Sequence, residues 1–262
     1  MANYFIYGNV NSLTYGVMIS GSGTFNKPQR RVEKITIPGR NGDVFVADNG
    51  FENVTVSYPA FIARGFEHKY HEFIEAMLAQ EGYCKLEDTY DINHYRMGIF
   101  QAPEEAEVGT LNRAGKFTLE FDCQPQRWLK MFSEYRTVWT QGETASNIRI
   151  ANPTKYIASP VIRVYGYGNF TLNATENMGI EVSDYSQEYS VYDHIDIDSE
   201  IEECYFGSTP LNEFVNIVIN GAQNAKSLFP QLAPGENILA IPETASQSSI
   251  DRIDIKTRFW TI

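Results

Sequence analysis

The side chains best suited to acid-base or metal chemistry at neutral pH are four histidines. They are His68, His71, His94 and His194. His71 begins a His-Glu-x-x-Glu run, in which the second histidine that a zinc-binding His-Glu-x-x-His helix requires is missing. His68 and His71 are three residues apart, and we expect them to lie on the solvated face of a helix. The histidines therefore predict no metal site.

Other catalytic motifs are also missing from the sequence. No Gly-x-Ser-x-Gly elbow and no phosphate-binding Walker loop is present, and Gly166-Tyr167-Gly168 lacks the third glycine of a dinucleotide fingerprint. The cysteines are few and widely spaced, so they predict neither a disulfide framework nor a metal cluster. They are Cys84, Cys123 and Cys204. We predict a protein that is not an enzyme and that binds no cofactor and no metal.

One acidic run supplies carboxylates for a hard cation. It contains Asp193, Asp196, Asp198 and Glu200. Calcium needs several converging oxygen ligands, but this run lacks the glycine and the terminal glutamate of a calcium-binding loop. The acids alternate with isoleucines, which favours the solvated face of a strand. A calcium site remains the alternative.

Tyrosines in the second half indicate a possible saccharide surface, because aromatic rings stack on sugars. Tyr165 and Tyr167 are the candidate residues. The competing interpretation is that these tyrosines cover a sheet or a subunit contact.

Charge and hydropathy exclude two classes of partner. The 262-residue chain has a net charge of −12, which argues against a nucleic-acid binder. No stretch approaches 18 apolar residues, so no membrane span is predicted. The start of the sequence lacks the features of a signal peptide, and we expect synthesis in a cytosol.

Periodicity predicts a mainly β protein with two domains. In the first half, apolar residues at helical spacing predict one helix over 66–81, and strict alternation predicts a strand over 116–123. The second half contains many short strand-like segments at close spacing, which are typical of an antiparallel sandwich or barrel. The predicted division is an α+β domain over 1–135, a linker over 136–152 and an all-β domain over 153–262.

The segment 27–46 predicts a long β-hairpin with basic residues beside it. Asn41-Gly42 favours a tight turn in which both residues have positive φ, and Pro38-Gly39 interrupts the strand before it. This hairpin is either an ordinary part of a sheet or an arm that contacts another subunit. The candidate arm residues are Arg30, Arg31, Ile35, Ile37, Arg40, Asn41 and Asp43.

Several short pieces, taken in order, resemble the distal tail proteins (Dit) of long, non-contractile-tailed phages that infect Gram-positive hosts. The N-terminal pieces are Thr24-Phe25-Asn26, residues 37–43, residues 86–91, Tyr95-Arg96 and residues 123–127. The C-terminal pieces are Phe229-Pro230, residues 234–237 and the terminal residues 258–262. Their order and spacing together carry the resemblance.

The resemblance implies a structural protein of the virion. It implies an N-terminal domain that closes into a homohexameric ring, alone or in stacked pairs, and a C-terminal galectin-like β-sandwich. The implied location is the tail tip of a siphovirus, in the baseplate that mediates host attachment, after synthesis in the host cytoplasm. The implied partners are the tail tube protein, a tail-associated lysin or fibre hub, and a receptor-binding protein. Under this interpretation the hairpin is an inter-subunit arm.

A carbohydrate-binding adhesin that contacts host cell-wall saccharide is the alternative function. It depends on the Tyr165 and Tyr167 surface. A galectin-like fold by itself does not imply sugar binding, and the cluster of ligand-binding residues typical of galectins is not found in a matching order.

Overall fold

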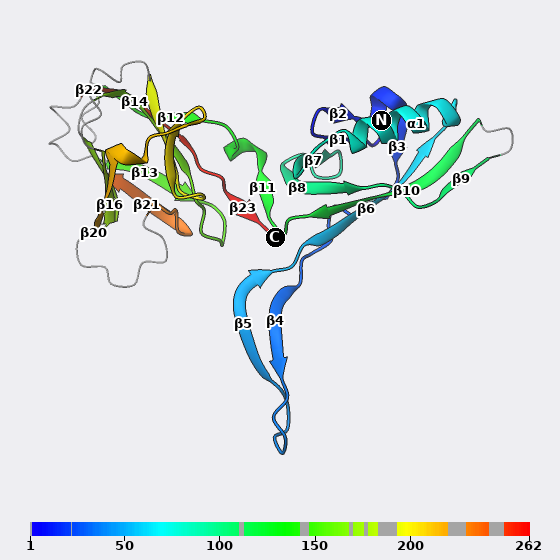
Figure 1. Ribbon diagram of the computed structural model, residues 1–262, viewed down its shortest axis with the longest axis horizontal. Helices are drawn as coiled ribbons and strands as arrows, with labels where there is room; N and C mark the ends of the chain where they lie inside the picture. The colour runs from blue at the N-terminus through cyan, green and yellow to red at the C-terminus, as the bar shows by residue number, and fades with distance from the viewer. Residues whose placement is uncertain are drawn as a thin grey trace. The chain divides into compact units, whose positions relative to one another are not determined.

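The computed structural model describes residues 2–21, 23–109, 113–141, 147–167, 170–175, 178–182, 193–219, 229–240 and 249–262. The chain divides into two compact units, Met1–Trp128 with Ile262 and Leu129–Thr261. Both consist mainly of antiparallel strands, which confirms the predicted mainly β class (Figure 1). Among the described residues, no helix is long and apolar enough to cross a membrane.

The first unit is built on one antiparallel sheet, in the order β2-β1-β7-β8-β10-β6-β3, with β9 beside β10. Its strands are β1 (Phe5–Tyr7), β2 (Val10–Asn11), β3 (Val17–Ile19), β6 (Val54–Ile62), β7 (Cys84–Asp88), β8 (His94–Gln101), β9 (Ala106–Val108) and β10 (Gly115–Cys123). A short 3-10 helix, Ser12–Tyr15, lies between β2 and β3.

Strict alternation gives this sheet one buried face and one open face. Along β10, the buried side chains are Phe117, Leu119, Phe121 and Cys123, as the sequence pattern predicted. Strand β6 shows the same alternation and pairs with β10 along its whole length. Because successive side chains of a strand point to opposite faces, each strand has one row in the core and one row outside it.

Helix α1 (Phe66–Leu78) covers the buried face of the sheet. Phe66, Phe73 and Met77 are its buried residues. The helix ends at Leu78, three residues before the predicted end, and Leu78 is exposed. Gly115 lies directly beneath the helix, where an added Cβ atom would overlap the Phe66 ring. The absence of a side chain at this position therefore lets the helix approach β10 closely.

Aromatic rings fill the core between helix and sheet. The Phe121 ring lies at the centre, with ring centroids of Tyr7 and Phe5 at 5.3 and 5.5 Å and that of Tyr58 at 5.9 Å. Tilted and edge-to-face arrangements of this kind stabilise aromatic pairs beyond the area that they bury.

The second unit is a sandwich of two antiparallel sheets. The first sheet has the order β12-β22-β14-β17-β18-β19, and the second has the order β13-β21-β15-β16-β20. Their strands are β12 (Arg136–Thr140), β13 (Asn147–Asn152), β14 (Val161–Tyr167), β15 (Phe170–Thr175), β16 (Met178–Val182), β17 (His194–Asp198), β18 (Glu203–Phe206), β19 (Thr209–Pro210), β20 (Val215–Ile219), β21 (Gly235–Ala240) and β22 (Ser249–Lys256).

Shorter elements complete this description. They are β11 (Arg127–Leu129), the 3-10 helices Lys130–Phe132 and Asn212–Phe214, and β23 (Trp260–Thr261).

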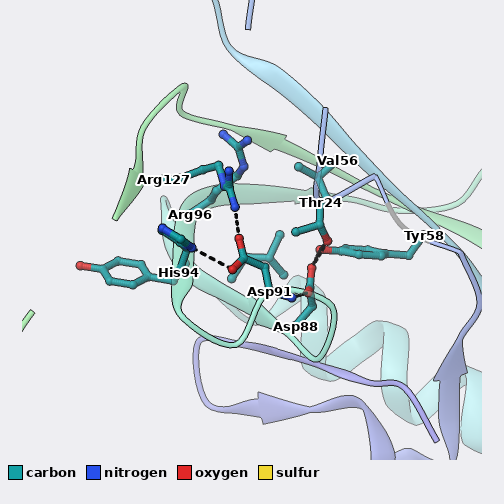
Figure 2. Close-up of a pocket in the computed structure, with 10 residues that line it drawn as sticks. Thr24, Val56, Tyr58, Asp88, Asp91, His94, Arg96 and Arg127 are labelled. Atoms are coloured by element: carbon teal, nitrogen blue, oxygen red, sulfur yellow. Dashed lines mark hydrogen bonds and ion pairs between the residues drawn. The ribbon is translucent and has the colours of Figure 1, made fainter. Parts of the chain in front are cut away.

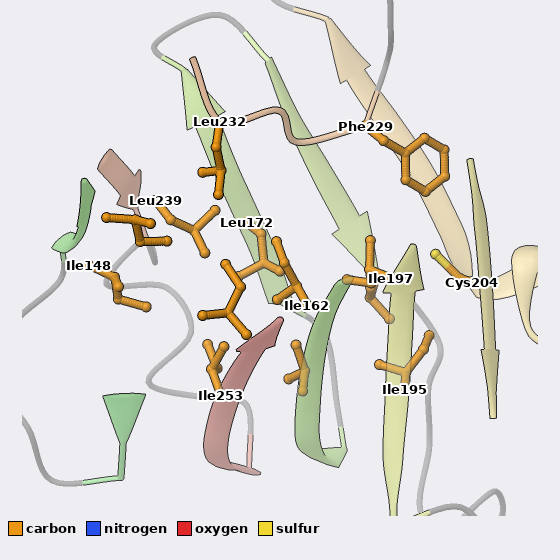
Figure 3. Close-up of a cluster of buried hydrophobic side chains, with 14 of the residues drawn as sticks. Ile148, Ile162, Leu172, Ile195, Ile197, Cys204, Phe229, Leu232, Leu239 and Ile253 are labelled. Atoms are coloured by element: carbon orange, nitrogen blue, oxygen red, sulfur yellow. The ribbon is translucent and has the colours of Figure 1, made fainter. Parts of the chain in front are cut away.

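Aliphatic side chains from both sheets meet in the core of the sandwich. Figure 3 shows Ile148 and Leu239 from one sheet beside Ile162, Ile197 and Ile253 from the other. This core is rich in isoleucine, whereas the core of the first unit is rich in aromatic residues. Each unit therefore has its own buried cluster.

The segment 136–152, for which we predicted a linker, contains strands β12 and β13. The division between the two units falls between Trp128 and Leu129. In β13, Ile148, Ile150 and Asn152 are buried in alternation with exposed residues. The Thr, Asn and Gln residues of this segment obscured that alternation, because they are common in both loops and strands.

Substituting Phe121 tests the aromatic core. We expect Phe121→Ala to lower the free energy of unfolding of the first unit by about 3–5 kcal/mol, because a large buried side chain leaves a cavity. Ile92→Ala, at a side chain that is 69% exposed and lies outside the arm, is the matched control and should cost about 0.5 kcal/mol or less. Urea unfolding of both variants measures the difference, and equal losses would contradict the assigned core.

Candidate functional site

A two-stranded hairpin contributes to neither buried hydrophobic cluster. It consists of β4 (Arg30–Ile35), β5 (Val44–Phe51) and the turn between them, and we call residues 30–51 the arm. Strands β4 and β5 form a sheet of their own, which Figure 1 shows extending away from the larger sheet. Every residue from Arg30 to Asp43 is exposed. All of the predicted arm residues thus lie on one exposed hairpin.

The arm carries apolar side chains on both faces. The register pairs Ile35 with Val44 on one face and Lys34 with Phe45 on the other. Exposed fractions are 43% for Ile35, 63% for Phe45 and 50% for Val46. An isolated two-stranded hairpin is marginally stable in water. Apolar groups on both faces of such a hairpin are typical of a surface that another chain covers.

The turn of the arm differs from the prediction. The ladder ends at Ile35 and Val44, so eight residues connect the strands instead of a two-residue Asn-Gly turn. Positive φ angles occur at Gly39 (82°) and Gly42 (80°) but not at Asn41. Pro38-Gly39 forms a turn closed by the Arg40 amide donating to the Ile37 carbonyl at 3.1 Å. Proline followed by a glycine of positive φ is the pattern of a type II turn. This turn therefore precedes the Asn-Gly pair in the chain.

Main-chain and side-chain hydrogen bonds attach the base of the arm to β6. The Gly23 amide donates to the Ser57 carbonyl at 2.9 Å, and Asn26 Nδ2 donates to the Thr55 carbonyl at 2.9 Å. Across the base, the Glu52 amide donates to the Gln29 carbonyl at 2.9 Å. The two chain segments that enter and leave the arm are therefore linked to each other and to the sheet.

The Asp88 carboxylate is the centre of a polar cluster beneath this base (Figure 2). One of its oxygens accepts hydrogen bonds from the Thr24 hydroxyl and, at 2.6 Å, from the Tyr58 hydroxyl. The other accepts from the amides of Tyr90 and Asp91 at 2.8 and 2.9 Å. Thr24 precedes the arm in the chain, so Asp88 connects the arm's entry segment to strands β6 and β7.

Arg96 is buried in the same cluster, with only 5% of its surface exposed. Its guanidinium donates to the carbonyls of Asn26 and Pro125, both at 3.0 Å. Burial lowers the pKa of Arg96 from its ordinary value. Arg96 therefore links the arm's entry segment on one side to the segment after β10 on the other.

Asp91 forms a third connection. It accepts from Arg127 through one oxygen and pairs with His94 Nδ1 at 2.8 Å through the other. Burial alone would raise the pKa of Asp91, but the hydrogen bonds from His94 and Arg127 outweigh burial and lower it. We call Thr24, Tyr58, Asp88, Asp91, His94, Arg96 and Arg127 the root cluster.

The root cluster is suited to holding chain segments together. The cavity among its residues has a volume of about 20 Å³, which is room for about one water molecule. Asp88 and Asp91 direct their oxygens at donors of the protein itself. The cluster attaches the segment that enters the arm to the sheet.

Four of the short pieces identified in the sequence meet in the root cluster. They are Thr24-Phe25-Asn26, residues 86–91, Tyr95-Arg96 and residues 123–127. These pieces carried the family resemblance, but no role was predicted for their residues. The signal available in the sequence was the presence of polar residues next to predicted strands. The pairing of β7, β8 and β10 brings these residues together in the folded protein.

The acidic run of the second unit is not a solvated strand face, which corrects the prediction. Asp196 and Asp198 on β17 are both only 3% exposed. Arg163 binds both oxygens of Asp196 at 2.7 Å, and Arg258 binds those of Asp198 at 2.6 and 2.8 Å. The arginines come from a neighbouring strand and from the end of the chain, so the alternation in β17 alone did not reveal them.

Tyr165 lies on the same sheet as these pairs. The Arg252 guanidinium is 4.0 Å from its ring centroid, and the His194 ring is at 5.3 Å. The Tyr167 side chain lies outside the described residues. A saccharide surface at Tyr165 and Tyr167 stays a prediction.

The remaining candidate ligands do not converge where the structure is described. His68 pairs with Glu72 at 3.4 Å on the exposed side of α1. No group of three or more His, Cys, Asp or Glu side chains among the described residues is arranged to hold a metal ion.

Fold and arm together define a mainly β protein of two units with a projecting hairpin. The chain matches the crystal structure of the SPP1 Dit protein (gp 19.1) with a TM-score of 0.65 and 16% identity, covering 100% of both chains. That protein is described as a paradigm of the hub adsorption apparatus in phages that infect Gram-positive hosts.

Two structures of the phage P2 baseplate in its activated conformation also match. The structure with Ca has a TM-score of 0.54 and 10% identity over 98% of both chains. The structure with Sr has a TM-score of 0.54 and 9% identity over 98% of this chain and 99% of that one. No protein-family model and no curated protein sequence matches. The chain therefore has the fold of phage distal tail and baseplate proteins, as its resemblance implied.

Removing the Asp88 carboxylate tests the root cluster. We expect Asp88→Ala to lower the free energy of unfolding of the first unit by about 2–3 kcal/mol, because it leaves buried donors without an acceptor. Asp43→Ala, at the exposed Thr36–Asp43 hydrogen bond of the turn, is the matched control and should cost about 0.5 kcal/mol or less. Urea unfolding measures both, and amide exchange should be faster at Gly23 and Asn26 only in Asp88→Ala.

The pKa of Asp198 predicts acid sensitivity in the second unit. Burial would raise this pKa, but the hydrogen bonds from Arg258 lower it below the ordinary value of 3.8. The unfolded chain therefore takes up the proton at a higher pH than the folded chain does. The stability that Asp198 contributes is complete above the ordinary value and is lost as the pH falls through the lowered one.

The test compares wild type with Asp198→Asn by urea unfolding between pH 7 and pH 2. We expect wild type to be more stable at pH 7 and the difference to narrow below about pH 4. Asp251→Asn, at an exposed carboxyl near the start of β22 in the same sheet, serves as the control. A difference that stays constant down to pH 2 would contradict the role of the Asp198 charge.

Proposed function

We propose that this protein is a structural hub of a phage tail tip, in which copies of the chain close head-to-tail into a homohexameric ring. The ring connects the tail tube to the host-adhesion device of the baseplate. The fold shared with the SPP1 Dit hub protein and with the phage P2 baseplate supports this function. The exposed arm is the observation that carries it, because the arm offers apolar and basic groups to another chain.

Burial of the arm's apolar side chains between chains would favour assembly over a free monomer. Ion pairs at an exposed surface contribute only about 0–1 kcal/mol each. Backbone pairing and burial of side chains such as Phe45 and Ile35 must therefore supply most of the contact energy. A ring repeats each contact once per subunit, so modest contacts add up to a stable assembly.

The proposed partners follow from the position in the tail. They are further copies of this chain, the tail tube protein, and a tail-associated lysin or fibre hub, with a receptor-binding protein as an additional partner. The proposed location is the virion, after synthesis in the host cytoplasm. Its role is mechanical connection and not catalysis, in line with the likeness to a hub protein.

Deleting the arm tests this proposal. Wild type should give the mass of six 29.8-kDa chains, or twice that for stacked rings, in light scattering coupled to size exclusion. A variant in which two glycines replace residues 31–46 should be monomeric, because the contact surface is gone. The unfolding transition of the second unit should be unchanged.

Two results would contradict the proposal. The first is a wild-type protein that stays monomeric at every concentration and also when mixed with the tail tube protein. The second is an arm-deleted variant that keeps the oligomeric mass of wild type. Electron microscopy of phage tails with a labelled chain checks the location, because label away from the tail tip excludes a hub.

A further inference from the structure

A groove lies on the open face of the first unit's sheet, at the end of β6 farthest from the arm. It has a volume of about 770 Å³. Pro59 and Phe61 of β6 line it together with Lys116, Thr118 and Glu120 of β10. The loop between β8 and β9 forms its wall, with Glu104 and Glu105. We call this hollow the acidic groove.

A second hollow of about 310 Å³ continues the acidic groove. The two share Phe61, Glu107 and Lys116. The second hollow is mainly apolar, with Ile62 and Val108 among its lining residues. One end of the combined surface is therefore acidic and the other end apolar. Strand β9 borders it and pairs with β10 through one edge.

The arm is complementary to this surface in charge. The arm, residues 30–51, contains four basic and three acidic side chains, a net charge of +1. Its exposed part over residues 30–43 contains four basic and two acidic side chains, a net charge of +2. The residues lining the acidic groove include four glutamates and one lysine, a net charge of −3. The basic residues on the arm are Arg30, Arg31, Lys34 and Arg40, and the glutamates are Glu104, Glu105, Glu107 and Glu120.

The apolar groups match as well. The arm exposes Ile37 and Phe45 beside its basic residues. The acidic groove exposes Phe61 and Pro59, and its continuation adds Val108. Burial of such groups on both sides would supply the hydrophobic part of an interface.

The arm of one chain points away from its own groove. Strand β5 runs from the turn back to the base of the arm. Strand β6 continues from Val54 at that base to Pro59 and Phe61 in the acidic groove and to Ile62 in its continuation. Pro59 and Ile62 are five and eight residues beyond Val54, or roughly 17–27 Å along the strand. The arm extends in the other direction, as Figure 1 shows. An arm that fills this groove must come from another copy.

We propose that the acidic groove is the acceptor for the arm of a second copy of this chain. This inference rests on the proposed function and identifies the surface that receives the arm in the ring. Donor and acceptor are different patches of the same chain, so the contact is heterologous. Each copy then offers one arm and one groove, and repetition closes a ring when the rotation allows. Among the described strands, β9 pairs only with β10, and its other edge would take a strand of the incoming arm by backbone pairing.

Charge reversal tests the pairing. A groove variant, Glu104→Lys with Glu105→Lys and Glu107→Lys, should weaken self-association roughly tenfold to hundredfold, because each pair becomes repulsive. An arm variant, Arg30→Glu with Arg31→Glu and Arg40→Glu, should weaken it to a similar extent. The two variants mixed, or all six substitutions in one chain, should restore much of the association. Sedimentation velocity over a concentration series measures each dissociation constant.

A matched control separates this pairing from a general effect of charge. Glu67→Lys with Glu72→Lys and Glu75→Lys makes the same change in net charge on exposed positions of α1 and should leave self-association unchanged. Thermal unfolding of every variant checks that the fold is kept.

Cross-linking gives an independent readout. Arg40→Cys and Glu105→Cys are made as separate chains in a Cys84→Ser background and mixed under oxidising conditions. A mixed disulfide is expected, whereas Arg40→Cys with Glu72→Cys should form none.

The outcomes distinguish the two proposals. If wild type forms rings and the groove variant forms them equally well, the acceptor is wrong and the hub function stands. If both reversed variants dissociate but their combination does not recover, the pairing is also wrong. A wild type that never assembles overturns the hub function itself.

Discussion

The Asp88 carboxylate is the constraint on which the arm depends. A hairpin of two strands has too little buried surface to hold its own direction in water. Asp88 accepts from Thr24 on the segment that enters the arm and from Tyr58 on the sheet. Arg96 adds two carbonyl contacts from the buried side. The arm's entry segment is thereby attached to the sheet through buried hydrogen bonds, and removing the Asp88 acceptor would leave buried donors without a partner.

The sheet that holds the arm also carries the proposed acceptor. Alternation along β6 and β10 directs aromatic rings into the core on one face, and it leaves Phe61, Lys116 and Glu120 on the other. Because β6 runs from the base of the arm to the acidic groove, donor and acceptor surfaces lie at opposite ends of one strand. This separation favours contact between chains over contact within a chain. The second unit has its own core.

The second unit uses buried ion pairs where the first uses the root cluster. Arg163 and Arg258 each bind one aspartate of β17 through two oxygens. Buried pairs of this geometry offset their desolvation only when both oxygens are satisfied. The carboxylates that resembled a cation site are thus held by the chain's own arginines.

The sequence by itself determined the strands with clean alternation, the start of the helix at Phe66 and the residues of the arm, because these depend on neighbours a few positions apart. It also carried enough ordered short pieces to indicate the fold. Only the tertiary structure decided that Thr24, Asp88 and Arg96 meet, that Asp198 is buried against Arg258, and that a groove faces away from the arm. The register of paired strands sets these contacts, and residues 60 or more positions apart in sequence contain no local signal of that register.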